Sequence, residues 1–217
     1  MTAQYHDGFD WGEECFSISA IEFPQRLLDI EALGLHPKTK DSTCKRGYTA
    51  IFRLDDTGER LLLDRLYTNN GKKEAPVIGG VAPVPLKSPA GNVYYKNLNL
   101  PIAYTGGIVI TTDFIGKLIV HHGFQPPENF KKVWELTFDN GRLVKKEDLS
   151  LLAEIRRLEN KIALRKARER GEADGEVKEM FKNALLGEAN TWGKDKAWIE
   201  RCYDISYDAK YVFHDKE

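Results

Sequence analysis

The chain has 217 residues, of which 41% are hydrophobic and 30% are charged, and its 32 lysines and arginines nearly balance 33 aspartates and glutamates. This composition excludes a collagen-like, a low-complexity and a disulfide-scaffold protein. The length predicts one globular unit with a small appendage. A chain of this size buries roughly 70% of the surface of its unfolded state, so we expect a hydrophobic core that needs no disulfide or metal.

The N-terminus and the cysteines favour a cytoplasmic protein. Residues 1–16 contain four acids and no apolar run, which is unlike a signal peptide. No stretch approaches 18 apolar residues, so we expect no membrane-spanning segment. The three cysteines, Cys15, Cys44 and Cys202, are odd in number and far apart. Such a set is typical of reduced thiols in a cytosol rather than of a disulfide framework.

Residues 1–148 show the patterns of strands and turns. Pro24 follows an alternating run and predicts a short helix over residues 25–33. Strands are predicted over residues 16–23, 48–54, 60–67, 93–97, 107–112, 117–122, 132–138 and 142–145. Asn140-Gly141, between the last two, is the strongest short signal for a hairpin. The Gly- and Pro-rich residues 68–90 are either a loop, whose length makes it a site candidate, or an extended edge segment.

The pattern changes to helical spacing after residue 148. Four apolar residues recur at intervals of four, three and four and form one stripe: Leu151, Ile155, Leu158 and Ile162. We expect this stripe to dock on the β-rich body, with Asp148 or Ser150 capping the helix.

The rest of the chain predicts further helices and a last strand. Helical patterns cover residues 176–186 and 194–202, and residues 205–213 alternate like a strand that returns to the sheet. The fold class is therefore α+β. Residues 1–148 form a mainly antiparallel β-sheet body (a sandwich, a barrel or a bent sheet). Residues 149–217 form a helical extension plus a final strand, packed on the body as one structural unit.

His121 and His122 end a predicted strand and are the first candidates for chemistry. Neighbouring residues of a strand point to opposite faces, so the two cannot share one metal, and no third ligand follows at a metal-like spacing. We therefore expect no metal and no cofactor. A small hydrolase or transferase would pair one histidine with Asp113 or Glu135. The alternative is structural, with one histidine hydrogen-bonded and the other exposed.

A cysteine nucleophile is the next alternative. Lys45 and Arg46 follow Cys44 and could lower the pKa of its thiol. A small, buried cysteine that precedes a strand is the commoner role, and we favour it here.

Several segments resemble a group of uncharacterised bacterial β-rich proteins. The segments that carry the resemblance are CKRGYTA (44–50), RLLLDRL (60–66), YTGGI (104–108), KLIVHHGF (117–124) and LTFDNGRL (136–143). They are similar to an Arg-Gly-Tyr opening followed by Phe-Thr-Gly and Val-His-Met-Gly-Tyr segments. The match spans about residues 44–145, with His122 in place of the usual Met and no Trp before Arg46. Because such genes often accompany toxin loci, the resemblance implies an immunity-like binding role, and it supplies no catalytic residues.

A basic cluster is the last lead. Residues 156–170 hold seven bases and two acids, and residues 172–179 then hold four acids and one lysine. The densest bases are Arg165, Lys166, Arg168 and Arg170. They form an ordinary solvated helix face, a surface for an acidic protein, or a nucleic-acid site, in that order of expectation, because the chain is not basic overall. We expect a non-enzymatic protein that occludes a protein partner such as a toxin; its oligomeric state is not predicted.

Overall fold

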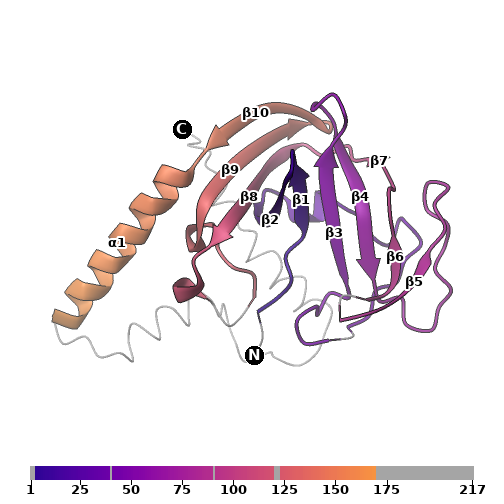
Figure 1. Cartoon of the computed structure of the whole chain (residues 1–217), viewed down its shortest axis with the longest axis horizontal. Coiled ribbons are helices and arrows are strands. Elements are labelled where there is room, and N and C mark those ends of the chain that lie inside the picture. Colours follow the sequence, from indigo (N-terminus) through magenta and orange to yellow (C-terminus); the bar gives the residue numbers. More distant parts are fainter. Residues whose placement is uncertain (1–2, 40, 90, 120–122, 170–217) are drawn as a thin grey trace.

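The computed structural model describes residues 3–39, 41–89, 91–119 and 123–169, which form a curved β-sheet followed by a long helix (Figure 1). The strands are β1 (Gly8–Trp11), β2 (Glu14–Ile21), β3 (Tyr48–Leu54), β4 (Leu61–Thr68), β5 (Val84–Ser88), β6 (Gly91–Tyr95), β7 (Leu100–Pro101), β8 (Gly106–Phe114), β9 (Phe130–Asp139) and β10 (Arg142–Asp148). The helix is α1 (Ser150–Glu169), and three short 3-10 turns are η1 (Pro24–Arg26), η2 (Gly116–Leu118) and η3 (Pro127–Asn129). The expected α+β class with a β-rich body is confirmed.

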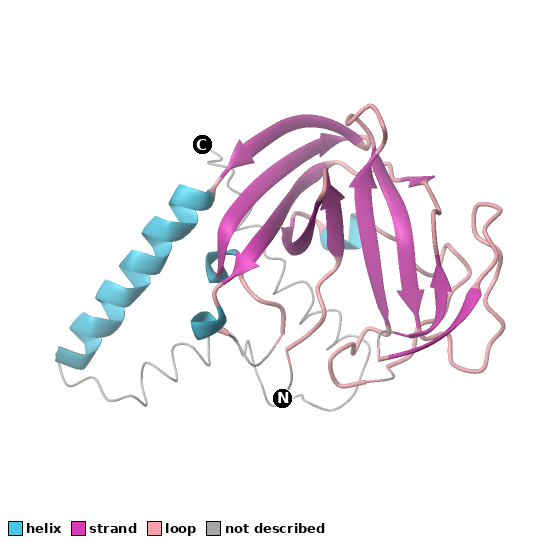
Figure 2. Cartoon of the chain, in the orientation of Figure 1, coloured by secondary structure: helices cyan, strands magenta, loops and turns pink. Residues whose placement is uncertain are grey.

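The strands form one mixed sheet in the order β10-β9-β8-β2-β1-β3-β4-β6-β5, with β7 added beside β4. Every strand pair is antiparallel except β1 with β3. Of the three expected shapes, the sheet is the bent one, and it does not close into a barrel (Figure 2). Its curvature brings the start of β10 to the start of β4, where the amide of Leu61 donates to the carbonyl of Gly141 at 2.8 Å.

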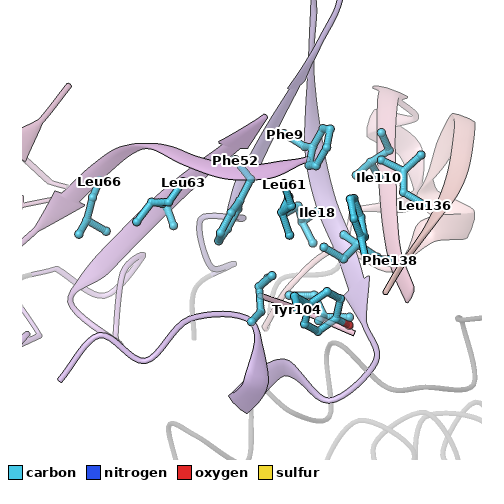
Figure 3. Close-up of a cluster of buried hydrophobic side chains, with 14 of the residues drawn as sticks. Phe9, Ile18, Phe52, Leu61, Leu63, Leu66, Tyr104, Ile110, Leu136 and Phe138 are labelled. Carbon is cyan, nitrogen blue, oxygen red and sulfur yellow. The ribbon is translucent and has the colours of Figure 1, made fainter. Parts of the chain in front are cut away.

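The core fills the concave side of this sheet. Phe9 of β1, Phe52 of β3, and Leu136 and Phe138 of β9 are each at most 1% exposed (Figure 3). Along β9, Leu136 and Phe138 enter the core and Trp134 packs against it, as the strict alternation predicts. The bend of the sheet is therefore maintained by side chains that lie far apart in the sequence.

The predicted hairpin at Asn140-Gly141 is confirmed as the turn between β9 and β10. Both residues have positive φ, 44° and 76°, which a two-residue hairpin turn of the primed type requires. A Cβ on Gly141 would lie 2.2 Å from the carbonyl oxygen of Ile102. The turn therefore also requires glycine because only a residue without a side chain fits this close to the backbone of Ile102.

The helix predicted over residues 25–33 is wrong. Only η1 forms there, and the carboxylate of Asp29 accepts hydrogen bonds from the amides of Glu31 (3.1 Å) and Ala32 (3.0 Å). An Asp side chain that caps its own downstream amides offers the backbone a turn in place of a helix. Leu27 is still buried, so the segment covers the core without helical structure.

Two further expectations change. The strand predicted from residue 117 is wrong for residues 117–119, where η2 forms and the side chains are exposed. Of residues 68–90, Val84–Ser88 form the edge strand β5, so the edge-segment alternative holds for that part. The predicted helices at 176–186 and 194–202 and the predicted strand at 205–213 lie outside the described residues.

Candidate functional site

The helix α1 is fixed to the body at its first turn. The amide of Leu149 donates to the carbonyl of Val133 on β9 (2.8 Å). The amide of Val133 in turn donates to the Ser150 hydroxyl (3.1 Å). Asp148 accepts from the Ser150 amide at 2.9 Å and is the capping side chain, one of the two expected. These bonds set the direction in which α1 leaves the sheet.

One face of α1 packs on the body. Ala153 is 4% exposed and lies against Phe130 and Val133. One turn later, the guanidinium of Arg157 donates to the carbonyls of Glu128 (3.1 Å) and Phe130 (2.7 Å). Two residues one turn apart therefore make the contact. Ala153 is small enough for the helix to approach the sheet closely, and Arg157 donates hydrogen bonds to backbone carbonyls at the start of β9.

The docking face predicted from the apolar stripe is wrong. The stripe residues are Leu151, Ile155, Leu158 and Ile162, and they are 69%, 42%, 53% and 54% exposed. At 100° per residue, the stripe lies nearly opposite Ala153 and Arg157. Helical periodicity identifies an apolar face correctly, but it does not indicate which neighbour that face meets.

The far end of α1 carries the basic cluster. Figure 1 shows this end well separated from the strands of the body. Arg165 is 81% exposed on its side chain and pairs with Glu169 at 2.8 Å, and Lys166 is also exposed, so the expected exposure of these two bases is confirmed. Arg168 belongs to α1, but its side chain and the whole of Arg170 lie outside the described residues.

The carboxylates proposed for catalysis are not brought together. Glu135 is 1% exposed and lies opposite Val109 in the β8–β9 pairing. Asp113 lies four residues further along β8, exposed, with its carboxylate 3.9 Å from the ammonium of Lys132. Four residues of strand correspond to about 13 Å. His121 and His122 lie outside the described residues, so the pairing with either carboxylate stays a prediction.

A histidine that the sequence did not single out lies at the start of the body. The Nδ1 of His6 donates to the carbonyl of Ile18 (2.7 Å), and its Nε2 accepts from the amide of Gln125 (2.9 Å). Burial lowers the pKa of His6 to about 4. The ring is therefore neutral near pH 7 and joins β2 to residue 125, which is a structural use of both nitrogens.

The residues of the Arg46-Gly47-Tyr48 motif make structural contacts. Arg46 forms a two-pronged ion pair with the buried Asp7, and its guanidinium lies 4.4 Å from the centre of the Tyr48 ring. Asp7 also accepts from the amide of Ala50 at 2.7 Å. Gly47 has φ of 80°, and a Cβ there would lie 2.5 Å from the carbonyl oxygen of Lys38. The motif therefore ties β1 and β3 together.

The remaining chemical candidates are a thiol and a shallow hollow. Cys44 is 4% exposed, and burial raises the pKa of its thiol, so it matches the favoured role of a small buried residue. The hollow, of about 190 Å³, is wide open to solvent. It is lined by Tyr5, His6, Thr49, Tyr67 and Ser88. Among the described residues that line the hollow, His6 is the titratable base, and both of its ring nitrogens are already hydrogen-bonded.

In the described part of the chain, no three residues among His, Cys, Asp and Glu are grouped to hold a metal ion. No helix there has the length and apolar character that crossing a membrane requires. Comparisons with known protein families, with curated proteins and with solved structures found no match to this chain.

Proposed function

We propose that this chain is a protein-binding protein of the immunity or antitoxin kind, which occludes an acidic protein partner with the basic end of α1. The observation that carries the proposal is the exposure of Arg165 and Lys166 at the far end of a helix that is fixed to the body by its other end. The basic end is defined as Arg165, Lys166, Arg168 and Arg170.

The bases contribute little to folding. An exposed ion pair such as Arg165–Glu169 contributes about 0–1 kcal/mol to stability. A cluster of like charges on a projecting helix instead attracts an acidic surface over several ångströms and raises the rate of association. Such a gain is the property that a protein needs when it must capture a toxin quickly.

The proposed setting is the cytoplasm of a bacterium. The resemblance of residues 44–145 to bacterial proteins supports the source. Cys15 is exposed and Cys44 is buried, and both are free thiols, which supports a reducing compartment. Partial desolvation of the thiol, with a smaller contribution from Asp10, raises the pKa of Cys15, so this cysteine is not an activated nucleophile.

We predict that the triple variant Arg165→Glu, Arg168→Glu, Arg170→Glu binds its partner more slowly but stays folded. The partner is first captured by cross-linking to the wild-type chain in the producing cells and is then purified. We expect association at low salt to slow at least fivefold, measured by surface plasmon resonance. The loss should shrink once added salt brings the Debye length below about 8 Å. The melting temperature should stay within a few degrees, because the Arg165 side chain is 81% exposed and an exposed ion pair contributes only about 0–1 kcal/mol.

The matched control is a second triple reversal, Lys72→Glu, Lys73→Glu, Lys87→Glu, at exposed lysines in the β4–β6 region. It makes the same change in net charge away from α1. If both variants slow association equally, overall charge and not the basic end governs binding. If neither variant slows it, the proposed binding surface is wrong.

A further inference from the structure

The exposed apolar stripe of α1 needs a partner. Its four residues, Leu151, Ile155, Leu158 and Ile162, are 42–69% exposed and lie on one face. No described element covers these four side chains. Leaving four large aliphatic side chains in water forgoes a hydrophobic gain that grows with the apolar area a partner would cover.

We propose that residues 176–186 of the same chain fold back on α1 as the second helix of an antiparallel αα-hairpin and cover this stripe. The segment has its own apolar face, formed by Val177, Met180, Phe181, Ala184 and Leu185. Gly171 and Gly175 precede it and are suited to end one helix and begin a turn. Two helices joined by a short Gly-containing connection pack antiparallel by default.

The connection has the necessary reach. From Ile162 to Glu169, α1 rises about 10 Å, and the six residues 170–175 span up to about 20 Å when extended. They can therefore run back along the last turns of α1 and bring Glu176 beside Ile162. The helix predicted over residues 176–186 is about 16 Å long, which equals the length of the stripe from Leu151 to Ile162.

The charges match in the same arrangement. The returning connection carries Glu172 and Asp174, and it passes the basic end of α1, where Arg165 and Lys166 are exposed. Residues 156–170 have a charge of about +5, and residues 172–179 have a charge of about −3. An antiparallel hairpin therefore sets acids against bases.

A second copy of the chain fits the stripe less well. Stable interfaces bury about 800 Å² on each partner, and four side chains that are already about half shielded offer much less. A segment of the same chain needs no such area, because a short flexible connection gives an effective concentration in the millimolar range. The small stripe is therefore sufficient for an intramolecular partner.

Hydrogen exchange of the full chain tests the proposal. We expect amides of residues 176–186 to exchange at least tenfold more slowly than in a free peptide of that sequence. Leu158→Asp places a charge in the stripe and should remove this protection. The control Asn160→Asp places the same side chain at an exposed position of α1 away from the stripe and should keep it. Unchanged amides in β8 and β9 show that the body is intact.

The results distinguish whether residues 176–186 or a second copy of the chain covers the stripe. The proposal is overturned if residues 176–186 exchange at the rate of the free peptide, or if Leu158→Asp leaves their protection unchanged. It is also overturned if protection grows with protein concentration while light scattering shows a doubled mass, because the occupant is then a second copy. Arg165→Glu with Lys166→Glu should reduce protection, and adding Glu172→Lys with Asp174→Lys should restore it.

One consequence rests on the proposed function. If an acidic partner binds the basic end, it competes with the acids of residues 172–179. Leu158→Asp, which releases the hairpin and leaves the basic end unchanged, should therefore bind the partner faster. The exchange experiment contains no partner, so a failure of the hairpin and a failure of partner binding are seen in separate measurements.

Discussion

Replacing Arg46 with methionine should lower the free energy of unfolding by about 3–5 kcal/mol, because it leaves the carboxylate of Asp7 buried without its cation. Asp7 is only 2% exposed, and the Arg46 side chain is 9% exposed in its ion pair. Methionine keeps much of the aliphatic stem of arginine, so the loss reports mainly the missing guanidinium, including its contact with the Tyr48 ring. Urea unfolding followed by tryptophan fluorescence measures the difference.

Arg142→Met is the matched control. Arg142 pairs with Glu59 at 3.3 Å, but both side chains are more than half exposed, so we expect a loss below about 1 kcal/mol. The double variant Asp7→Leu, Arg46→Met removes both buried charges and should recover part of the loss. An Arg46→Met protein as stable as the Arg142→Met protein would contradict the structural role assigned to the motif.

Strands that show clear periodicity could be predicted from the sequence. The prediction for residues 48–54 coincides with β3, and the predictions for 107–112 and 132–138 lie within β8 and β9. Residues 132–138 alternate because Trp134, Leu136 and Phe138 face the core. Residues 107–112 are rich in β-branched side chains because β8 is buried on both faces. Asn140-Gly141 was predictable for a separate reason, because few residue pairs adopt two consecutive positive φ angles.

Other elements could not be predicted, because contacts that a sequence pattern does not show determine their structure. The strand β1 has four residues, too few to show a period, and it is fixed by parallel pairing with β3, about 40 positions later. Asp29 prevents the helix predicted at 25–33 by a local side-chain bond that propensity does not register. Tertiary context of this kind has no signal in a single sequence.

Some features of the candidate site could be predicted from the sequence and others could not. The exposure of Arg165 and Lys166 followed from their position beyond the end of the stripe, and the structure agrees. The orientation of α1 did not follow, because it depends on Ala153 and on the carbonyls that Arg157 meets at the start of β9. His6 was missed because a lone histidine in an N-terminal segment shows no spacing that marks it as a structural connection.

The stability of the protein should fall as the pH is lowered from about 6.5 to about 4, and His6 should account for up to about 3 kcal/mol of that fall. In the unfolded chain, an ordinary histidine binds its proton near pH 6.5. In the folded chain, burial lowers the pKa to about 4, although the neighbouring Asp7 opposes the shift and Arg46 adds to it. The unfolded state therefore binds the proton first. The contribution of His6 is complete above pH 6.5 and is lost progressively between the two values.

Two measurements isolate this contribution. An NMR titration should show the His6 ring signals unchanged from pH 8 to pH 5, whereas a ring with an ordinary pKa changes over that range. In urea unfolding at a series of pH values, His6→Gln should flatten the pH dependence between 6.5 and 4, because glutamine can offer a donor and an acceptor but cannot gain a proton. His36→Gln, at an exposed histidine, should keep the wild-type dependence. A His6 signal that titrates near pH 6.5 would mean that the ring reaches solvent, and its two hydrogen bonds would then not hold β2 to residue 125.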